Sequence, residues 1–105
     1  MKVIFSPDAR AYVAREAAYL RERHRAGGER FLHDVKQFVT ALRQFPSMGQ
    51  EATDLPLRGL RRFVLGDYLI HYEVGAEAIV ILTIRNGRER PPELPLDDDE
   101  DFEER

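Results

Sequence analysis

The sequence has 105 residues, of which 43% are apolar and 33% are charged, and it contains no cysteine. This composition indicates one globular domain with a modest core, and it excludes a disulfide framework and thiolate chemistry. No apolar run approaches the roughly 18 residues that a membrane-spanning helix needs, and the start, "MKVIFSPDAR", has too short an apolar run for a signal peptide. We therefore expect a cytoplasmic protein without membrane contact.

The charges divide the chain into two parts. The last nine residues, "DDDEDFEER", hold seven of the 19 acidic residues and one of the 16 basic residues. Residues 1–96 therefore keep 12 acids and 15 bases, a net charge of +3, and all of these bases except Lys2 and Lys36 are arginine. We expect one folded domain over residues 1–96, with arginines suited to phosphate or carboxylate groups, and a disordered acidic tail over residues 97–105.

The first half of the chain predicts a strand followed by a helical hairpin. Residues 2–5, "KVIF", favour a strand, and "SPDA" then supplies an N-cap serine, a proline at the first helical position and an acid for the helix dipole. We expect Gly27–Gly28 to separate the two helices and Pro46 to end the second. The apolar face of the first helix consists of Ala9, Val13, Ala17 and Leu20, and that of the second of Phe31, Val35, Phe38, Val39 and Leu42.

The second half of the chain predicts a sheet. Residues 46–56 are typical of a loop, and three runs with short turns, residues 60–65, 68–74 and 78–84, favour an antiparallel meander. The last run is apolar on both faces, as in a strand inside a sheet. The predicted order is β-α-α-β-β-β, an α+β fold with the helical hairpin packed on one face of the sheet. In the middle run, Tyr68, Ile70, Tyr72 and Val74 share one face, and Leu69, His71 and Glu73 share the other.

Residue patterns for catalysis are sparse. Gly27–Gly28 lacks the lysine of a phosphate-binding loop, Ser6 and Ser47 lack a nucleophile elbow, and the helical histidines have no partner at metal-ligand spacing. We therefore expect no metal and no cofactor. His71, in the middle of a strand, is a candidate general base, and the alternative is a half-exposed strand residue without a catalytic role.

Arginines near the ends of the predicted strands give the clearest functional signal. Because the first and third strands of a meander run in the same direction, we expect the arginines at the start of one and the end of the other to form two separate patches. They either bind phosphate or carboxylate groups of a partner, or form a solvated surface with local ion pairs, for example to Glu89. The first group is Arg58, Arg61 and Arg62, and the second is Arg85, Arg88 and Arg90.

Four segments, in their order and spacing, resemble the RelE/ParE superfamily of toxins from bacterial type II toxin–antitoxin systems. They are "FSPDARAYV", "GGERFLHDVKQFVTALRQFP", "LRGLRRFVLGDYLIHYEV" and "IVILTIRNGRER". The resemblance covers residues 2–92. It implies a toxin domain over residues 1–96 and a cognate antitoxin as partner.

The two activities of the superfamily imply different targets. RelE-like members cut messenger RNA on the ribosome, whereas ParE-like members inhibit DNA gyrase. Arg61, Arg62 and Arg88 match basic positions of the RelE-like members, but Leu69 stands where those members have an arginine, and no tyrosine or histidine follows Tyr72. The resemblance therefore favours a ParE-like gyrase inhibitor that is not an enzyme, whose residues for binding the target or the antitoxin are Arg58, Arg61, Arg62, Arg85, Arg88 and Arg90.

Two alternatives remain open. One is a ribosome-dependent mRNA endoribonuclease that uses Arg61, Arg62, His71 and Arg88, and the other is a non-toxic relative that only binds an antitoxin. Antitoxins of this superfamily wrap the toxin with a helix and an extended segment, so we expect a hetero-oligomer. The exposed members of Tyr12, Tyr19 and Phe45 are candidate anchors, and the alternative for each is a place in the core. The acidic tail is either a solubility tail or a segment that folds back over Arg85, Arg88 and Arg90.

Overall fold

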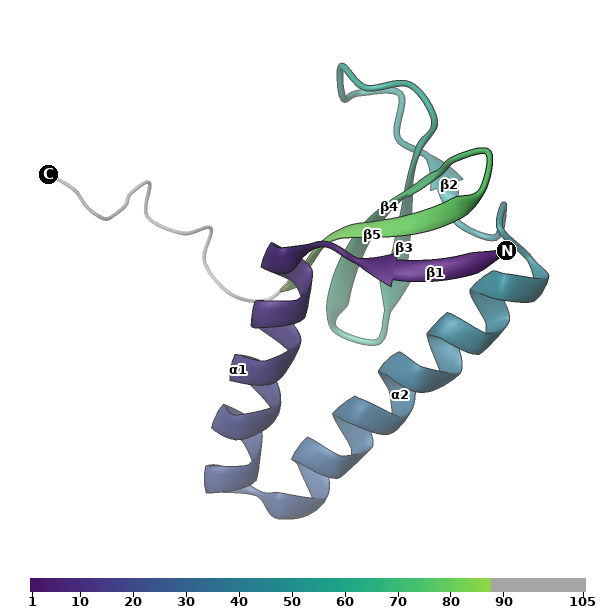
Figure 1. Cartoon of the computed structure of the whole chain (residues 1–105). Coiled ribbons are helices and arrows are strands. Elements are labelled where there is room, and N and C mark those ends of the chain that lie inside the picture. Colours follow the sequence, from purple (N-terminus) through teal and green to yellow (C-terminus); the bar gives the residue numbers. More distant parts are fainter. Residues whose placement is uncertain (88–105) are drawn as a thin grey trace, which may run out of the picture.

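The protein, seen in a computed structural model that describes residues 1–87, has an α+β fold in which two helices form a hairpin beside one sheet (Figure 1). The predicted element order is confirmed, with one additional short strand inside the predicted loop 46–56. In chain order the elements are β1 (Lys2–Phe5), α1 (Pro7–Arg23), α2 (Arg25–Gln44), β2 (Gln50–Glu51), β3 (Leu60–Leu65), β4 (Tyr68–Val74) and β5 (Ala78–Asn86).

The sheet has the strand order β1-β5-β4-β3-β2. Strands β3, β4 and β5 pair antiparallel as predicted. The sheet is mixed, because β1 pairs parallel with β5 from Lys2 opposite Ala78 to Phe5 opposite Ile81. Strand β5 therefore lies inside the sheet, as predicted, with Ile79, Ile81 and Ile84 buried on its core side. The additional strand β2 pairs antiparallel with β3 over only two residues.

Helix α1 begins where the sequence predicts. The Oγ of Ser6 accepts a hydrogen bond from the backbone N–H of Ala9 at 3.0 Å and donates one to the carbonyl oxygen of Leu82 at 2.8 Å. The first bond caps the helix, and the second ties its start to β5. Neither helix of the described residues is long and apolar enough to cross a membrane.

The break between the helices lies at His24, so the predicted break at Gly27–Gly28 is wrong. His24 is extended, with φ at −161°, and its Nδ1 accepts a hydrogen bond from the N–H of Gly27 at 3.1 Å, which satisfies an amide in the first turn of α2. Both glycines are helical. A Cβ at Gly28 would lie 2.5 Å from the Cγ of Arg21 and 3.1 Å from the carbonyl oxygen of Ala17, so this glycine allows the helices to approach closely.

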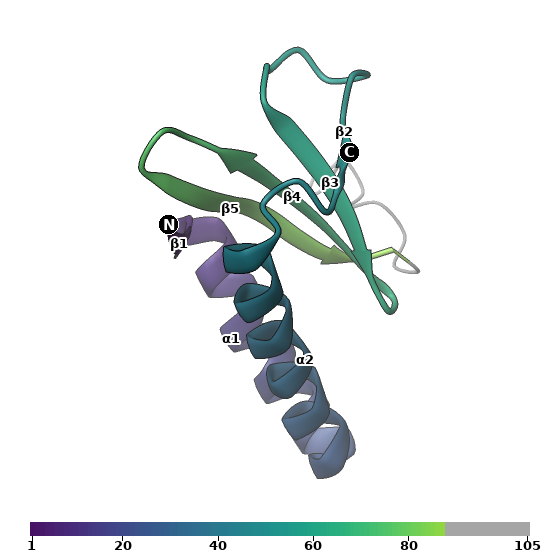
Figure 2. The same cartoon turned by 90° about the vertical axis from the view of Figure 1, so that its right-hand side faces the viewer.

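The core lies between the helices and one face of the sheet, and both helices are on that side (Figures 1 and 2). The predicted apolar faces of both helices are confirmed, because Ala17 on α1 and Phe38 on α2 are buried. The predicted alternation of β4 is also confirmed, because Ile70 and Tyr72 are fully buried. Removing this apolar surface from water is the main stabilising contribution, about 25 cal/mol per Å². The principal cluster consists of Ala9, Phe38, Leu42, Ile70, Tyr72, Ile79, Ile81 and Ile84.

Tyr72 fixes the segment that leads from α2 to the sheet. Its hydroxyl donates a hydrogen bond to the carbonyl oxygen of Pro46 at 2.8 Å and accepts one from the N–H of Gly49 at 2.9 Å. A Cβ at Gly49 would lie 2.8 Å from the carbonyl oxygen of Arg62 and 2.9 Å from that hydroxyl. The position therefore requires glycine, and β2 forms directly after it.

Candidate functional site

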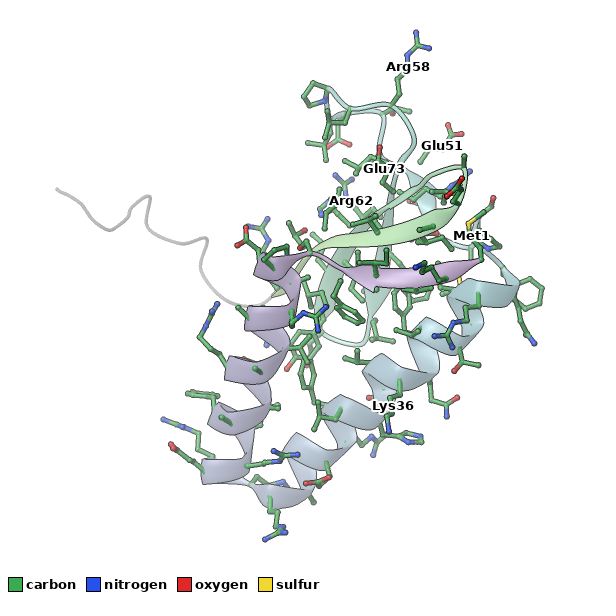
Figure 3. All side chains as sticks on the ribbon, viewed as in Figure 1. Met1, Lys36, Glu51, Arg58, Arg62 and Glu73 are labelled. Carbon is green, nitrogen blue, oxygen red and sulfur yellow. The ribbon has the colours of Figure 1, made fainter. Side chains whose placement is uncertain are left out.

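The face of the sheet opposite the helices carries most of the described site residues that the sequence predicts. Residues that alternate along β3, β4 and β5 with the buried core residues point to this side. Figure 3 shows Arg62 and Glu73 on it, away from both helices. We call it the open face, and it consists of Ile4, Arg62, Val64, Leu69, His71, Glu73, Val80, Thr83 and Arg85.

A chain of polar contacts crosses the middle of the open face. Arg62, His71 and Thr83 lie opposite one another on β3, β4 and β5. The Nε of Arg62 donates a hydrogen bond to the Nε2 of His71 at 3.0 Å, and the Nδ1 of His71 lies 3.2 Å from the Oγ1 of Thr83. The Nη2 of Arg62 reaches both carboxylate oxygens of Asp54, at 3.2 and 3.0 Å. Arginine can only donate, so Nε2 must carry the lone pair of a neutral imidazole and Nδ1 the proton.

The electrostatic surroundings hold His71 neutral. Its pKa lies below the usual 6.5, first because the ring is partly buried and then because Arg62 and Arg85 place positive charge beside it; Asp54 opposes this with a smaller effect. The pKa of Asp54 is also lowered, mainly by the hydrogen bond from Arg62. At pH 7 the open face therefore carries the positive charges of Arg62 and Arg85 beside the negative charges of Asp54 and Glu73, and its imidazole adds no charge.

Arg62 and Arg85 belong to one patch, so the prediction of two separate patches is wrong for this pair. Arg62 lies opposite His71, whereas Arg85 lies opposite Leu69, only two residues further along β4. Both arginines act on the pKa of His71. Arg62 is the third of the six residues of β3 and not the first, so it lies nearer to Arg85 than the start of β3 lies to the end of β5. Arg85 is exposed, and among the described residues it has no carboxylate partner.

Arg61 and Arg58 lie apart from this patch. Arg61 lies opposite Tyr72, on the core side of β3, and its Nη1 donates hydrogen bonds to the carbonyl oxygens of Ser47 at 3.3 Å and Gly49 at 2.6 Å. Its contacts therefore stabilise the segment before β2. Arg58 lies at the far end of the loop between β2 and β3 (Figure 3). A cavity of about 440 Å³ lies against this loop, lined by Ala52, Leu55, Leu57, Leu60 and others.

Two residues that contact Arg62 or His71, namely Asp54 and Thr83, are not predicted from the sequence. Asp54 comes from the predicted loop, and no local signal in the sequence indicates that it reaches Arg62. Thr83 could have been found, because it alternates with Arg85 on the predicted strand and therefore shares its face. Arg88, Arg90 and the acidic tail over residues 97–105 lie outside the described residues. Within residues 1–87, no group of His, Cys, Asp and Glu side chains could hold a metal ion.

The aromatic residues predicted as anchors for an antitoxin differ in exposure. Tyr19 is 50% exposed, with the guanidinium of Arg23 3.8 Å above its ring, and Phe45 is 62% exposed just after α2. Tyr12 is half-buried, and its hydroxyl accepts a hydrogen bond from the N–H of Asn86 at 3.0 Å. Tyr19 and Phe45 are therefore available at the surface, whereas Tyr12 belongs mainly to the contact between α1 and β5.

Comparison with known proteins yields a family and a fold. The family described as "ParE toxin of type II toxin-antitoxin system, parDE" matches residues 3–91. A solved structure, "Chromosomal ParDE TA system from P. aeruginosa", superposes with a TM-score of 0.63 and 21% sequence identity, over 82% of this chain and 95% of that chain. At that identity the similarity shows the fold alone. No curated protein matches the chain.

Proposed function

The chain belongs to the family of ParE toxins of type II toxin–antitoxin systems, and from this premise we propose that it acts by inhibiting DNA gyrase. The match confirms the resemblance found in the sequence and lies on the ParE side of the superfamily. ParE-like members act by binding their target rather than by cutting RNA. The proposal therefore requires a surface that binds a large partner, and it requires no set of catalytic residues.

The state of His71 is the observation that carries the proposal. RNA cleavage needs a base that can take a proton from a 2′-hydroxyl and an acid that can protonate the leaving oxygen. The lone pair of His71 Nε2 accepts the hydrogen bond from Arg62, and Nδ1 faces Thr83. Both ring nitrogens of the imidazole that the sequence suggests as a base therefore already have polar partners within the protein. The arrangement favours a binding surface, on which Arg85 is the cation without an ion pair among the described residues, over a proton-transfer site.

The surface proposed to bind gyrase is the open face with the adjoining loop. Arg85 and the outer side of Arg62 supply positive charge, and Val64, 65% exposed, supplies apolar area beside them. Arg58 extends the surface along the loop between β2 and β3. Arg88 and Arg90 follow Arg85 in the sequence, and we include them among the proposed contact residues. Arg61 contributes to the binding surface indirectly, because it stabilises the segment before β2 through the carbonyl oxygens of Ser47 and Gly49.

We further propose that a cognate antitoxin neutralises the protein in a hetero-oligomer. Tyr19 and Phe45 offer exposed aromatic anchors for a helix. Among the described residues, β1 has β5 as its only strand partner, so its outer edge can accept an extended segment by strand addition. This partner would bind mainly to the helical hairpin, on the other side of the sheet from the open face, and to the outer edge of β1.

A supercoiling assay with two matched variants tests the docking surface. Arg85→Ala removes a charge from the open face, whereas Arg10→Ala removes a charge from the exposed side of α1. We expect Arg85→Ala to weaken inhibition of purified gyrase roughly tenfold, equivalent to about 1.4 kcal/mol of binding, while Arg10→Ala inhibits like the unmodified protein. Equal inhibition by all three proteins would contradict the assignment of the open face.

A second candidate function is ribosome-dependent cleavage of mRNA. The observation that favours it is the convergence of Arg62, His71 and Arg85 on one face, because cations near an imidazole could stabilise a phosphorane. In that case His71→Asn would abolish RNA cleavage on programmed ribosomes. Under gyrase inhibition, neither the unmodified protein nor this variant cleaves RNA.

A further inference from the structure

The end of the open face nearest the last described residue is basic, apolar and exposed. Arg85, Leu69 and Val64 form one row across β5, β4 and β3. Val64 is 65% exposed, and among residues 1–87 no acid forms an ion pair with Arg85. The described chain ends at Gly87, whose N–H donates a hydrogen bond to the carbonyl oxygen of Asp67 at the turn between β3 and β4. The chain therefore leaves the sheet beside this row.

The sequence beyond Gly87 matches the row in charge and in apolar content. Residues 97–105 carry seven carboxylates, one arginine and a single aromatic residue, Phe102. Nine residues, 88–96, join this segment to Gly87, and they can span up to about 30 Å when extended. Adjacent strands lie about 4.8 Å apart, so the distance from β5 to β3 is only about 10 Å. The segment can therefore reach every residue of the patch.

We propose that residues 97–105 dock on the open face of their own chain, with carboxylates at Arg85 and with Phe102 against Val64 and Leu69. The segment acts as an internal competitor for the partner that binds this face. Docking itself is independent of what that partner is. The consequence for gyrase rests on the function proposed above.

The open face is a better site for the segment than the helical hairpin, although the hairpin also carries many arginines. On the hairpin, Arg21 pairs with Glu29 at 3.2 Å, and Arg23 lies over the ring of Tyr19. Other arginines of the hairpin, such as Arg25 and Arg30, have no ion pair among the described residues, so charge alone does not separate the two sites. The open face is favoured because the described chain ends beside it at Gly87 and because Val64 adds an apolar contact that the segment's aromatic residue can use. A short tether also gives an effective concentration of about the millimolar range, so a weak contact suffices.

A spin label at the chain end tests the docking directly. The chain has no cysteine, so Arg105→Cys provides a unique attachment point. We expect the label to broaden the amide signals of Val64, Leu69 and Arg85 at low salt, and the broadening to fade as added salt screens the charges. The matched control keeps the same length and label but replaces the seven acids of the segment with Asn and Gln; it should not broaden these signals.

Broadening of other amide signals would overturn the proposal. Broadening centred on Tyr19 and Arg25 would place the segment on the hairpin, and uniform weak broadening would show that it has no site. Docking on a second copy of the chain is distinguished from docking within one chain by a mixed sample. In this sample one chain carries the spin label without isotope enrichment, and the other is isotope-enriched without a spin label. Broadening in that mixture as strong as within one chain would mean that the segment docks on a neighbour.

Deletion of residues 97–105 tests the competition. If the segment covers the face for about four fifths of the time, its removal strengthens gyrase inhibition about fivefold at low salt. Docking in the spin-label experiment together with unchanged inhibition would contradict the competition. Absence of gyrase inhibition in both chains would contradict the proposed function, and the spin-label result would still decide whether the segment docks.

Discussion

Arg62 and His71 lie opposite each other on β3 and β4, and the Nε of the arginine donates a hydrogen bond to the Nε2 of the histidine at 3.0 Å. Since a guanidinium cannot accept a hydrogen bond, protonation of His71 would break this contact and place two cations side by side. The contact therefore fixes both the tautomer and the charge of the imidazole. The pKa of His71 therefore responds to the charges around the ring.

We expect the pKa of His71, followed by NMR titration of the ring protons, to lie below 6.5. Arg85→Ala should raise this pKa, because it removes one of the positive charges that act on the ring. The exposed Arg10 on α1 provides the matched control, and Arg10→Ala should leave the titration unchanged. A pKa at or above 6.5 in the unmodified protein would contradict the geometry of the patch.

The lowered pKa of His71 also predicts how stability depends on pH. As the pH falls, the unfolded chain binds a proton at His71 before the folded chain does. The stabilisation from neutral His71 is therefore complete above pH 6.5 and is lost as the pH falls toward the folded-state pKa. His71→Asn removes this dependence.

Urea unfolding of both proteins at about pH 7.5 and about pH 5 measures that dependence. The difference in unfolding free energy between the unmodified protein and His71→Asn should shift against the unmodified protein at the lower pH. The comparison cancels the contributions of the ionisable groups that both proteins share. A difference that does not change with pH would refute a lowered pKa at this position.

Tyr72→Phe should destabilise the fold by about 1–3 kcal/mol, because it leaves the buried N–H of Gly49 and the carbonyl oxygen of Pro46 without their partner. Tyr19→Phe, at an exposed tyrosine, should change stability by less than about 0.5 kcal/mol. Chemical denaturation compares the two variants. If Tyr72→Phe behaves like Tyr19→Phe, the hydroxyl does not anchor the segment before β2.

Ser6→Ala should destabilise the protein by about 1–2 kcal/mol, because Ala9 loses its cap and Leu82 loses a hydrogen-bond donor. Ser6→Thr keeps the hydroxyl and should retain most of the stability. Thermal unfolding of the two variants makes the comparison. An equal loss in both would show that the site is limited by side-chain volume rather than by these hydrogen bonds.

The sequence predicts the features of the fold that depend on local periodicity. The stripe from Phe31 to Leu42 and the alternation around Ile70 and Tyr72 are read directly from the spacing of apolar residues. The parallel pairing of β1 with β5 joins residues that are more than seventy positions apart, and no local pattern encodes it. The two-residue strand β2 is too short for any periodicity to indicate.

The candidate site was predicted in its residue types but not in its arrangement. Arg62, His71 and Arg85 were all identified, yet two arginines were assigned to separate patches. Their proximity depends on two registers, the one between β3 and β4 across the turn at Gly66 and Asp67 and the one between β4 and β5, which has an irregularity at His71 and Tyr72. The role of Arg61 within the fold, at the carbonyl oxygens of Ser47 and Gly49, depends on a loop conformation that sequence spacing does not specify.

The most direct test of the central claim uses the purified protein in two parallel assays, one for gyrase supercoiling with scoring of cleavage complexes and one for mRNA cleavage on programmed ribosomes. Gyrase inhibition makes cleavage complexes accumulate while the RNA stays intact, and Arg85→Ala reduces the effect. RNA cleavage without any effect on gyrase, lost in His71→Asn, would contradict the account and assign the open face to an endoribonuclease.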